Sequence, residues 1–458
     1  MINKQDIIHF CGIGGVGMSA IAKLMHTAGH TVQGSDLGDS GSIKNIGITV
    51  FDTQIAQNLA EVKHFVYSSA IKPGNLEYDY AVKNGINMWH RADILGYLMK
   101  NKYGIVVSGT HGKTTTTAML ADLFIKTQTP ATSLVGGVVK GTIDRCLIDS
   151  TGNGYILTEG DESDKSFLKF SRKVSIVTNV DLDHMENYEH NADILFDAFA
   201  QFINETAANG ICILCKDSQM LREKVAPMIT HANVVWYSCD NRSDSICAEN
   251  IVCDEDGSVF DIKFADKIIK NVSIPLFGLH NIANSLAVII AADYLKIDAE
   301  KIKSAIATFG GVKRRFDIIG TFRGATIIDD YAHHPVEIIA TLKAARNKYG
   351  NNARIIAVLQ PHRYSRVEKL LNDFVNCLDD ADIKIVTDIY GAFEDRTQYG
   401  DLSYLDLVKV IENGGSAKVE AIEKLSDIGI FLEKNIKPND IVVFLGAGDA
   451  SNYARSIV

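Results

Sequence analysis

The chain has 458 residues, of which 46% are hydrophobic and 22% are charged, and its formal net charge is -10 at pH 7. A chain of this length typically forms about three domains, and its composition is that of a globular protein with sizeable cores. The negative charge argues against nucleic-acid or membrane-surface binding, because both need basic patches. An anionic ligand must therefore be held locally, by backbone amides and a few placed cations.

The cysteines and the N-terminus bear on the compartment. We expect the eight cysteines to be mostly buried free thiols, since Cys11, Cys212 and Cys215 lie in or beside apolar runs. The opening MINKQDIIHFCGIGG leads directly into a strand and a glycine turn, so we expect neither a cleavable leader nor a membrane span. These features predict a cytoplasmic protein.

The first 102 residues read as βαβ units. IIHFCG, HTVQGSD and HFVYSSAI are predicted strands, and GMSAIAKLMHTAG is a predicted amphipathic helix that stops at a glycine. A new strand, YGIVVSG, begins at Tyr103, and apolar runs then alternate with helices as far as KIKSAIATFGG.

Two further features complete the predicted organisation. A polar section near 237–273 is typical of antiparallel strands, and after GVKRRFDIIG the βα alternation resumes to the end of the chain. Strands that alternate with helices predict doubly wound parallel sheets. We therefore expect an α/β fold of three domains: a Rossmann-like N-terminal domain at 1–102, a central P-loop ATPase-type domain at 103–311 and a Rossmann-like C-terminal domain at 312–458.

The stretch GTHGKTTTT, which follows the strand YGIVVS, is the strongest chemical signal. A glycine turn between a strand and a helix presents backbone N–H groups to an anion, and the helix N-terminus adds partial positive charge. Lys113 can reach the β- and γ-phosphates of a nucleotide, and the Thr114 hydroxyl can bind Mg²⁺. The strict GxxxxGK[ST] pattern fails because residue 107 is Val, and the shorter GxxGKT is present. The alternative is a chance glycine turn, but the preceding strand favours phosphate binding.

A second glycine turn, GIGGVGMS, fits GxGxxG after a strand, and Asp36 ends the next strand near the spacing of a ribose-binding acid. The pattern predicts a diphosphate on a helix N-terminus without specifying the nucleoside. The alternative is a purely structural tight turn.

Acidic residues follow two predicted strands of the middle domain, in TEGDESD and NVDLDHMENY. Carboxylates beside a phosphate loop commonly supply Mg²⁺ ligands, because Mg²⁺ takes hard oxygen donors. Either run could instead be a solvated loop. The candidates are Glu159, Asp161, Glu162, Asp164, Asp181, Asp183 and His184.

Other polar residues fall at helix starts and strand ends. Asn281 and Asn284 share one helical face, where they could read a purine edge or cap the helix. A second set comes from KRRFD, DDYAHHP and PHRYSR, the last two after β runs, and could line a shared cleft. Its members are Arg314, Arg315, Asp330, His333, His334, Arg363 and Arg366.

Together these stretches resemble the Mur ligases, the ATP-dependent amide-forming enzymes of peptidoglycan synthesis. The resemblance runs in order through essentially the whole chain, from GIGGVGMS and GTHGKTTTT to DDYAHHP, QPHRYSR and FLGAGDA. GIGGVGMS with DDYAHHP resembles the alanine-adding branch rather than the D-glutamate-adding one. This implies a monomeric or homodimeric enzyme that uses ATP and Mg²⁺ to join L-alanine to the lactyl carboxylate of UDP-N-acetylmuramate through an acyl phosphate.

The resemblance also implies which residues hold the two nucleotides. The first domain would bind the UDP of the sugar substrate rather than NAD, with Asp36 near the uridine, and the middle domain would bind ATP. The residues assigned to the UDP-sugar are Gly12, Gly14, Gly15, Gly17, Asp36 and Ser69. Those assigned to ATP are Gly109, Thr110, His111, Gly112, Lys113, Thr114, Thr115, Asn281, Asn284, Arg315 and Asp330.

The metal and the chemistry are assigned in the same way. By position in the motifs, the metal ligands would be Thr114, Glu159 and His184, with Glu162 as the alternative to Glu159. Arg315 matches the arginine that faces the transferred phosphate, and the last domain would line the amino-acid side. The residues assigned to catalysis are Lys113, Arg315, His333, Arg363 and Arg366.

Two departures from the family pattern bear on the branch. Many Mur ligases carry a carbamylated lysine shortly after the DHM histidine, but this chain has no lysine between Lys173 and Lys216. The alanine-adding branch is similar in lacking it, so the gap supports that branch. Gly160 stands where alanine is common, which bears on the local backbone more than on the chemistry.

Three other functions stay open from the sequence. A recycling ligase that attaches a whole tripeptide to the same sugar nucleotide shares most of these motifs. An NAD-dependent dehydrogenase built on GIGGVG leaves GTHGKTTTT unexplained. A nucleotide-switch module without chemistry does not account for the paired histidines and arginines of the last domain.

Overall fold

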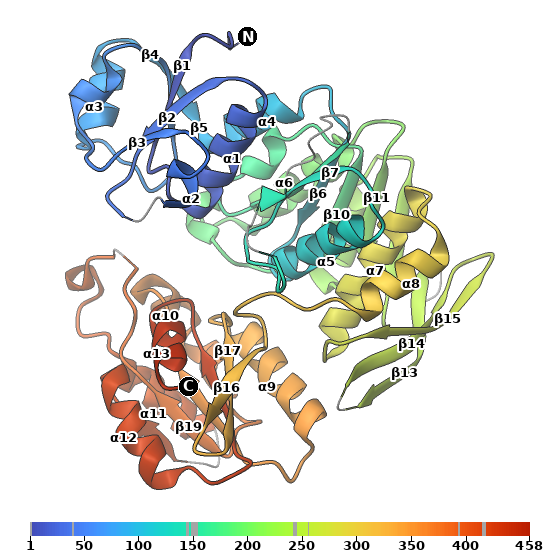
Figure 1. Ribbon diagram of the computed structural model, residues 1–458. Helices are drawn as coiled ribbons and strands as arrows, with labels where there is room; N and C mark the ends of the chain where they lie inside the picture. Colours follow the sequence, from blue (N-terminus) through green and yellow to red (C-terminus); the bar gives the residue numbers. More distant parts are fainter. Residues whose placement is uncertain are drawn as a thin grey trace. The chain divides into compact units, whose positions relative to one another are not determined.

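The computed structural model describes residues 2–38, 41–142, 146–147, 154–240, 245–254, 256–392, 394–414 and 418–458 (Figure 1). The chain forms two compact units. Unit 1 consists of Met1–Val138, Thr142–Cys247 and Ala283–Ala305. Unit 2 consists of Val139–Gly141, Ala248–Ile282 and Ile306–Val458.

Unit 1 begins with a five-stranded parallel sheet of order β3-β2-β1-β4-β5. Its strands are β1 (Ile7–Cys11), β2 (Thr31–Ser35), β3 (Thr49–Phe51), β4 (Val62–Tyr67) and β5 (Asn87–His90). Its helices are α1 (Val16–Thr27), α2 (Gly41–Lys44), α3 (Leu76–Lys83) and α4 (Arg91–Met99), with the 3-10 turn η1 (Ala56–Leu59). The chain order reverses between β1 and β4, and sheets of this class bind their ligands at such a point. The glycine turn after β1 therefore lies where the sequence predicts a nucleotide.

The part of a ten-stranded sheet that belongs to unit 1 has the order β12-β11-β10-β6-β9-β7-β8, so β6 lies between β10 and β9. Its strands are β6 (Gly104–Ser108), β7 (Ala131–Leu134), β8 (Cys146–Leu147), β9 (Tyr155–Glu159), β10 (Val174–Val177), β11 (Ile211–Cys215) and β12 (Val234–Ser238). The helical segments are α5 (Lys113–Lys126), η2 (Ser166–Lys169), η3 (Met185–Tyr188), α6 (Ala192–Asn204), the π-helical η4 (Leu221–Val225) and η5 (Ala226–Met228). Strands β6, β9 and β10 are parallel, so the loops after them leave the same edge.

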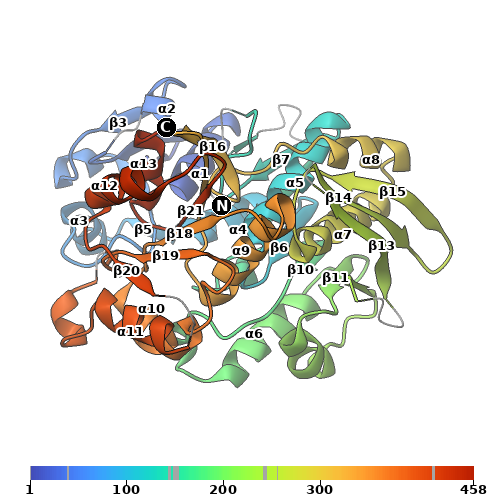
Figure 2. The ribbon, with the colours of Figure 1, turned by 90° about the horizontal axis from the view of Figure 1, so that it is seen from below.

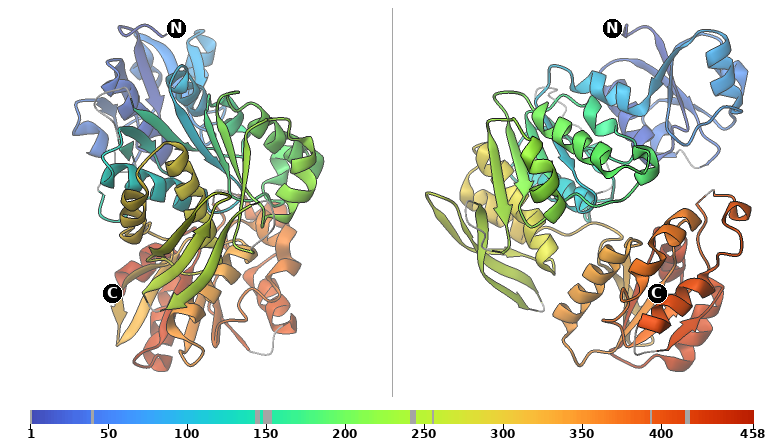
Figure 3. Two further views of the ribbon diagram at one scale, coloured as in Figure 1. Left: turned by 90° about the vertical axis from the view of Figure 1, so that its right-hand side faces the viewer. Right: turned by 180° about the vertical axis from the view of Figure 1, so that it is seen from behind.

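The polar section near 237–273, predicted to form antiparallel strands, is only partly antiparallel. β13 (Ile246–Asp254) begins parallel to β12, whereas β14 (Gly257–Lys263) and β15 (Ile268–Ile274) form the predicted antiparallel pair. Figure 3 shows that pair as two long twisted strands. The helices α7 (Leu279–Tyr294) and α8 (Ala299–Ala307) follow.

Unit 2 contains a six-stranded sheet of order β16-β17-β21-β18-β19-β20. Its strands are β16 (Asp317–Phe322), β17 (Ala325–Asp330), β18 (Ile355–Leu359), β19 (Ile383–Val386), β20 (Val419–Ala421) and β21 (Ile441–Leu445). Its helices are α9 (Pro335–Tyr349), α10 (Tyr364–Leu370), η6 (Leu371–Phe374), η7 (Arg396–Tyr399), α11 (Tyr404–Gly414), α12 (Leu425–Asn435) and α13 (Ala450–Ser456). The central strands are buried along their length, as strands covered on both faces must be, because α9 and α11 pack on one face and α12 and α13 on the other (Figure 2). β16 is an antiparallel edge strand that the sequence reading did not separate from its neighbour.

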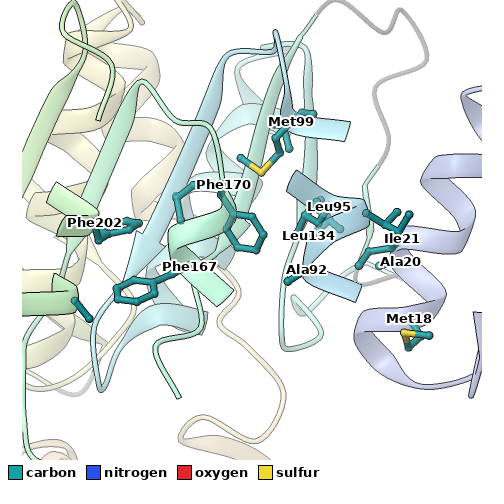
Figure 4. Packing of buried hydrophobic residues seen from close by; sticks show 14 of the residues in the cluster. Met18, Ala20, Ile21, Ala92, Leu95, Met99, Leu134, Phe167, Phe170 and Phe202 are labelled. Carbon is teal, nitrogen blue, oxygen red and sulfur yellow. The ribbon is translucent and has the colours of Figure 1, made fainter. Parts of the chain in front are cut away.

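One apolar cluster joins the two sheets of unit 1. Buried side chains of α1, including Met18 and Ile21, share it with Leu95 of α4, Phe167 of η2 and Phe202 of α6 (Figure 4). Burial of such side chains is the main favourable term in folding. The glycine turn after β1 and the acidic loop after β9 therefore belong to one packed body.

All eight cysteines are free, as predicted. Six are buried, whereas Cys253 is exposed. Cys212 and Cys215 have a C-I-L-C spacing, yet both are unpaired thiols on β11. No helix in the described ranges is long and apolar enough to cross a membrane.

Candidate active site

The predicted phosphate loop connects β6 to α5 in unit 1. α5 begins at Lys113, and Gly112 at its N-cap has φ +82°, a left-handed conformation that favours glycine. The first N–H groups of a helix lack partners within it, and such an end is suited to anions. The predicted residues that lie in this loop or in the first turn of α5 are Gly109, Thr110, His111, Gly112, Lys113, Thr114 and Thr115.

Lys113 reaches back over the loop. Its Nζ donates to the carbonyl oxygens of Gly109 and Thr110, at 2.6 and 3.2 Å, and to both carboxylate oxygens of Glu162, at 2.9 and 2.7 Å. Burial lowers the pKa of Lys113, but the carboxylates of Glu162 and Asp161 raise it more, so the ammonium stays charged. Burial raises the pKa of Glu162 to about 7, and Lys113 opposes that rise. The lysine is therefore held, charged, at the loop by a buried carboxylate.

Thr114 lies beside Glu159 rather than Glu162. Its Oγ1 donates to Glu159 Oε2 at 3.0 Å, and the backbone N–H of Gly136 donates to Glu159 Oε1 at 2.6 Å. A hydroxyl and a carboxylate side by side are the hard oxygen donors that Mg²⁺ prefers. The arrangement favours Glu159 over Glu162 as the ligand, because Thr114 contacts the carboxylate of Glu159.

His184 lies among acids of its own segment. It has a left-handed backbone with φ +53°, and its ring nitrogens lie 3.6 Å from Asp183 Oδ2 and 3.7 Å from Glu186 Oε1. Within the described ranges, no three His, Cys, Asp or Glu side chains gather so that they could hold a metal ion. The structure thus brings Thr114 to Glu159, while a shared site with His184 stays a prediction.

Sequence reasoning missed Asn179, which follows β10 and contacts the phosphate loop. Its Oδ1 accepts from His111 N at 2.8 Å and its Nδ2 donates to His111 O at 2.9 Å. An asparagine two residues after a buried strand beside β6 was the available signal.

The two asparagines of α7 differ in their surroundings. Asn284 is 6% exposed, and a Cβ added to Gly112 would lie 2.7 Å from its Oδ1, so its side chain lies against the phosphate loop. Asn281 is in unit 2, and its Nδ2 donates to Phe277 O at 2.8 Å. Their binding of adenine stays a prediction.

The first glycine turn is held by the end of β2. Gly12, with φ +76°, donates its N–H to Ser35 O at 2.8 Å, and Gly14 donates to Asp36 Oδ2 at 2.7 Å. Gly15 closes the turn with a 3.1 Å bond to Gly12 O and forms the N-cap of α1. Asp36 therefore orients the turn itself, a contact that the spacing rule for a ribose-binding acid does not anticipate.

A cation that sequence reasoning missed lies beside this turn. A Cβ added to Gly17 would lie 2.8 Å from Arg91 Nη1, and the same guanidinium is 3.6 Å from Asp161 Oδ2. The predicted Ser69 hydroxyl lies 3.1 Å from His90 Nε2, where burial lowers the histidine pKa. The first-domain candidates thus cluster around the turn and the start of α4.

In unit 2, the carboxylate of Asp330 accepts hydrogen bonds from two backbone N–H groups. Its oxygens accept from Phe316 N at 2.6 Å and from Ala332 N at 2.7 Å. Burial raises its pKa to about 6, and Arg315 opposes that rise. Arg315 itself lies 3.9 Å from Glu337. Asp330 therefore positions the loop that carries Arg315.

Two neutral histidines lie side by side in unit 2. His333 Nδ1 donates to Tyr331 O at 2.9 Å, and its ring centroid is 5.3 Å from that of His362, which stacks on Tyr390. Burial lowers the pKa of His333 to about 4 and that of His362 to about 3, and the guanidinium of Arg366 adds to both shifts. Arg366 Nη1 donates to His362 Nδ1 at 3.2 Å.

Arginines surround this pair. Arg363 is the N-cap of α10 and has a positive φ of +68°, and the Nε atoms of Arg363 and Arg314 are buried without a hydrogen-bond partner among the described residues. Buried donors that lack partners are rare in native proteins. Arg314 also donates through Nη2 to Gly446 O at 2.9 Å. The cluster combines cations with neutral imidazoles, which suits an anionic group such as a carboxylate.

Three family models match the chain in order. They are the Mur ligase family catalytic domain at 7–103, the Mur ligase middle domain at 107–292 and the Mur ligase glutamate ligase domain at 314–448. The UDP-N-acetylmuramate–L-alanine ligase of Rickettsia bellii is 38% identical over 463 residues, which cover 99% of this chain and 96% of the relative. The chain belongs to the Mur ligase family.

Other Mur ligases agree with this assignment. The enzyme of the same name from Rickettsia prowazekii is 38% identical over 98% of this chain and 92% of its own. The solved UDP-N-acetylmuramate–alanine ligase of Thermotoga maritima matches with a TM-score of 0.80 at 27% identity, over 98% of this chain and 97% of that one. The murein peptide ligase of Psychrobacter arcticus matches with a TM-score of 0.70 at 25% identity, over 99% and 98%.

These findings confirm the predicted family and its three-domain α/β fold. The boundaries at 102 and 311 stay predictions. A dehydrogenase or a switch module is left without support, because the similarity to ligases covers the whole chain.

Proposed function

We propose that this Mur ligase is a cytoplasmic enzyme that joins L-alanine to the lactyl carboxylate of UDP-N-acetylmuramate, forming UDP-N-acetylmuramoyl-L-alanine, ADP and phosphate. The observation that carries the proposal is the 38% identity, over 99% of the chain, to a ligase named for that reaction. The charged Lys113 at the loop after β6 supports it, because the reaction needs a cation at the transferred phosphate.

The chemistry follows from the poor reactivity of a carboxylate. A carboxylate oxygen attacks the γ-phosphorus of ATP, the bond to ADP breaks, and an acyl phosphate forms. The amine of L-alanine then attacks the acyl carbon, and the tetrahedral intermediate expels phosphate as the amine loses its proton. Phosphoryl transfer of this kind depends mainly on positioning and electrostatics.

Residues of unit 1 would serve the first step. Lys113 would exchange Glu162 for phosphate oxygens, and Thr114 with Glu159 would hold Mg²⁺, with His184 as a further proposed ligand. Mg²⁺ held there would supply positive charge against the repulsion between carboxylate and triphosphate. The glycine turn after β1 would hold the diphosphate of the sugar nucleotide.

Residues of unit 2 would serve the amine side. Arg363 and Arg366 would bind the carboxylate of L-alanine, and Arg315 would face the transferred phosphate. Because Nδ1 of His333 donates to a backbone carbonyl, its Nε2 is left to accept from the amine. A pKa of about 4 makes His333 a contact for the amine rather than its base at neutral pH.

A second candidate is ligation of a murein tripeptide to the same sugar nucleotide. It is favoured by the match to the Psychrobacter arcticus murein peptide ligase. The two reactions share the phosphate chemistry and differ in the amine, so the acceptor decides between them.

Phosphate release from ATP, measured with UDP-N-acetylmuramate and each acceptor, tests the proposal. We expect release with L-alanine and little with the tripeptide, and one ¹⁸O from a labelled substrate carboxylate should appear in the phosphate. Faster release with the tripeptide would favour the second candidate. Release without label transfer would exclude the acyl phosphate.

A further inference from the structure

Strand pairing places the segment Thr178–Asp181 alongside the phosphate loop. β10 is parallel to β6, with Val177 opposite Ser108, so the two chains leave the sheet together. Thr178 N donates to Ser108 O at 3.0 Å and continues the ladder one step beyond the strands.

Asn179 binds the loop through both ends of its side-chain amide. The amide accepts from His111 N at 2.8 Å and donates to His111 O at 2.9 Å, and Asn179 O accepts from Thr110 N at 3.3 Å. A side-chain amide that satisfies both polar groups of one backbone residue takes the place of a neighbouring strand. It fixes the orientation of the peptide groups on either side of His111.

The loop and the segment are in close contact. A Cβ added to Gly109 would collide with Thr178 Oγ1 and would lie 3.0 Å from Asn179 N. Thr178 Oγ1 also donates to His111 O at 2.5 Å, and Asp181 N donates to Thr110 Oγ1 at 2.9 Å. Contacts from the segment Thr178–Asp181 therefore hold the loop in place, in addition to the loop's own turn.

We propose that Asn179 is a positioning residue that holds the loop Gly109–Gly112 in the conformation that binds the phosphates of ATP. The inference rests on the proposed function in one respect, namely that the ligand of this loop is ATP. A loop fixed before binding loses less conformational entropy when the ligand arrives, so its affinity is higher. Asn179 acts through the loop, so its removal should affect ATP and not the sugar nucleotide.

Asn204 provides a matched control. Its Nδ2 donates to Met228 O at 3.0 Å and its Oδ1 accepts from Thr230 N at 2.7 Å, so it bridges backbone groups in the same way at the end of α6. Both asparagines lie in unit 1, and only Asn179 contacts the phosphate loop.

The experiment compares Asn179→Ala and Asn204→Ala in the full chain, by calorimetric titration with ATP and by thermal unfolding. We expect a similar drop in Tm for both, but an increase of about tenfold in the Kd for ATP only in Asn179→Ala, with the Kd for UDP-N-acetylmuramate, titrated in the same way, unchanged. A Kd within about twofold of wild type for Asn179→Ala, or an equal weakening in Asn204→Ala, would overturn the inference.

Asn179→Asp adds a readout that a merely structural role would not affect. The carboxylate can still accept from His111 N but cannot donate to His111 O until it is protonated. We expect its affinity for ATP to recover towards wild type as the pH falls, whereas Asn179→Ala shows no such recovery. Parallel pH profiles for the two variants would count against the proposal. A wild-type chain that binds ATP yet releases no phosphate with L-alanine would contradict the proposed function alone, because this comparison depends only on binding.

Discussion

At the scale of single residues, the contact between Lys113 and Glu162 determines how the loop receives its ligand. The ammonium is charged and already has four oxygen acceptors, two of them from one carboxylate. An incoming triphosphate therefore replaces an existing ion pair instead of meeting a free cation. The net gain on binding is then smaller than the full Coulomb attraction, because one buried pair is exchanged for another.

Lys113→Ala should abolish useful turnover. The reaction loses the cation that offsets charge on the transferred phosphate, so we expect kcat to fall on the order of 10² to 10⁴. Lys126→Ala, on the same helix and paired with Asp122, is the control and should keep near-normal activity. Steady-state phosphate release measures both, and a normal rate in Lys113→Ala would remove it from the mechanism.

The neutral histidines of unit 2 make stability depend on pH. Burial holds the pKa of His333 at about 4, below its ordinary value of 6.5, so the unfolded chain takes up a proton first as the pH falls. The free energy of unfolding should therefore decrease by about 1 to 3 kcal/mol from this residue between pH 6.5 and 4. His362 acts in the same direction, and Asp330, with its raised pKa, acts in the opposite one.

Denaturant unfolding of His333→Gln and wild type at pH 7 and pH 4.5 isolates this effect. The variant should lose less stability on acidification, because it lacks the group that the unfolded state protonates. His26→Gln on α1 is the control and should follow wild type. Equal losses in all three proteins would show that His333 is not held neutral by the fold.

At the scale of elements, the loop between β6 and α5 depends on its glycines. Gly109 has φ +132°, and its Cα faces Thr178 and Asn179 without room for a side chain. Gly47 also has a positive φ, +85°, but no atom lies within 4 Å of an added Cβ. Both glycines have a positive φ, but only Gly109 is crowded. Comparing an alanine substitution at each position therefore separates the effect of crowding from that of backbone strain.

Gly109→Ala should therefore cost about 1 to 3 kcal/mol more stability than Gly47→Ala, and it should also weaken ATP binding. Chemical denaturation and nucleotide titration measure the two effects. If both variants were equally stable and bound ATP equally, the close packing of the loop on the segment after β10 would be unimportant.

Periodicity predicts the long elements well and their pairing poorly. The buried runs IVVS, IIAVL and IVVFL become β6, β18 and β21, because strands covered on both faces are continuously apolar. β3 and β20 have only three residues each, too few for a periodic signal. The parallel start of β13 depends on its pairing with β12, which no local pattern specifies.

The candidate site likewise contains residues that the sequence predicts and residues that it does not. Motif spacing places Lys113, Thr114 and Glu159, which the fold brings together, because loops after neighbouring parallel strands leave one sheet edge. Spacing could not place Asn179 or Arg91, since each acts through a contact made only after folding.

At the scale of the whole molecule, the family models and the compact units divide the chain at different positions. The family models end the first segment at residue 103 and start the second at residue 107. The compact unit nevertheless includes both, because α1 and α4 share a cluster with η2 and α6. Segments that are distinct in sequence can thus share one core.

That shared cluster constrains how such enzymes can diverge. A chimera that took its first hundred residues from one relative and its next two hundred from another would bring mismatched helix faces together at Met18, Leu95 and Phe167. The graft would leave voids or overlaps, each of which destabilises a close-packed interior. The two segments are therefore expected to be inherited as a pair. Changes in the buried side chains of one segment would be compensated by changes in the buried side chains of the other.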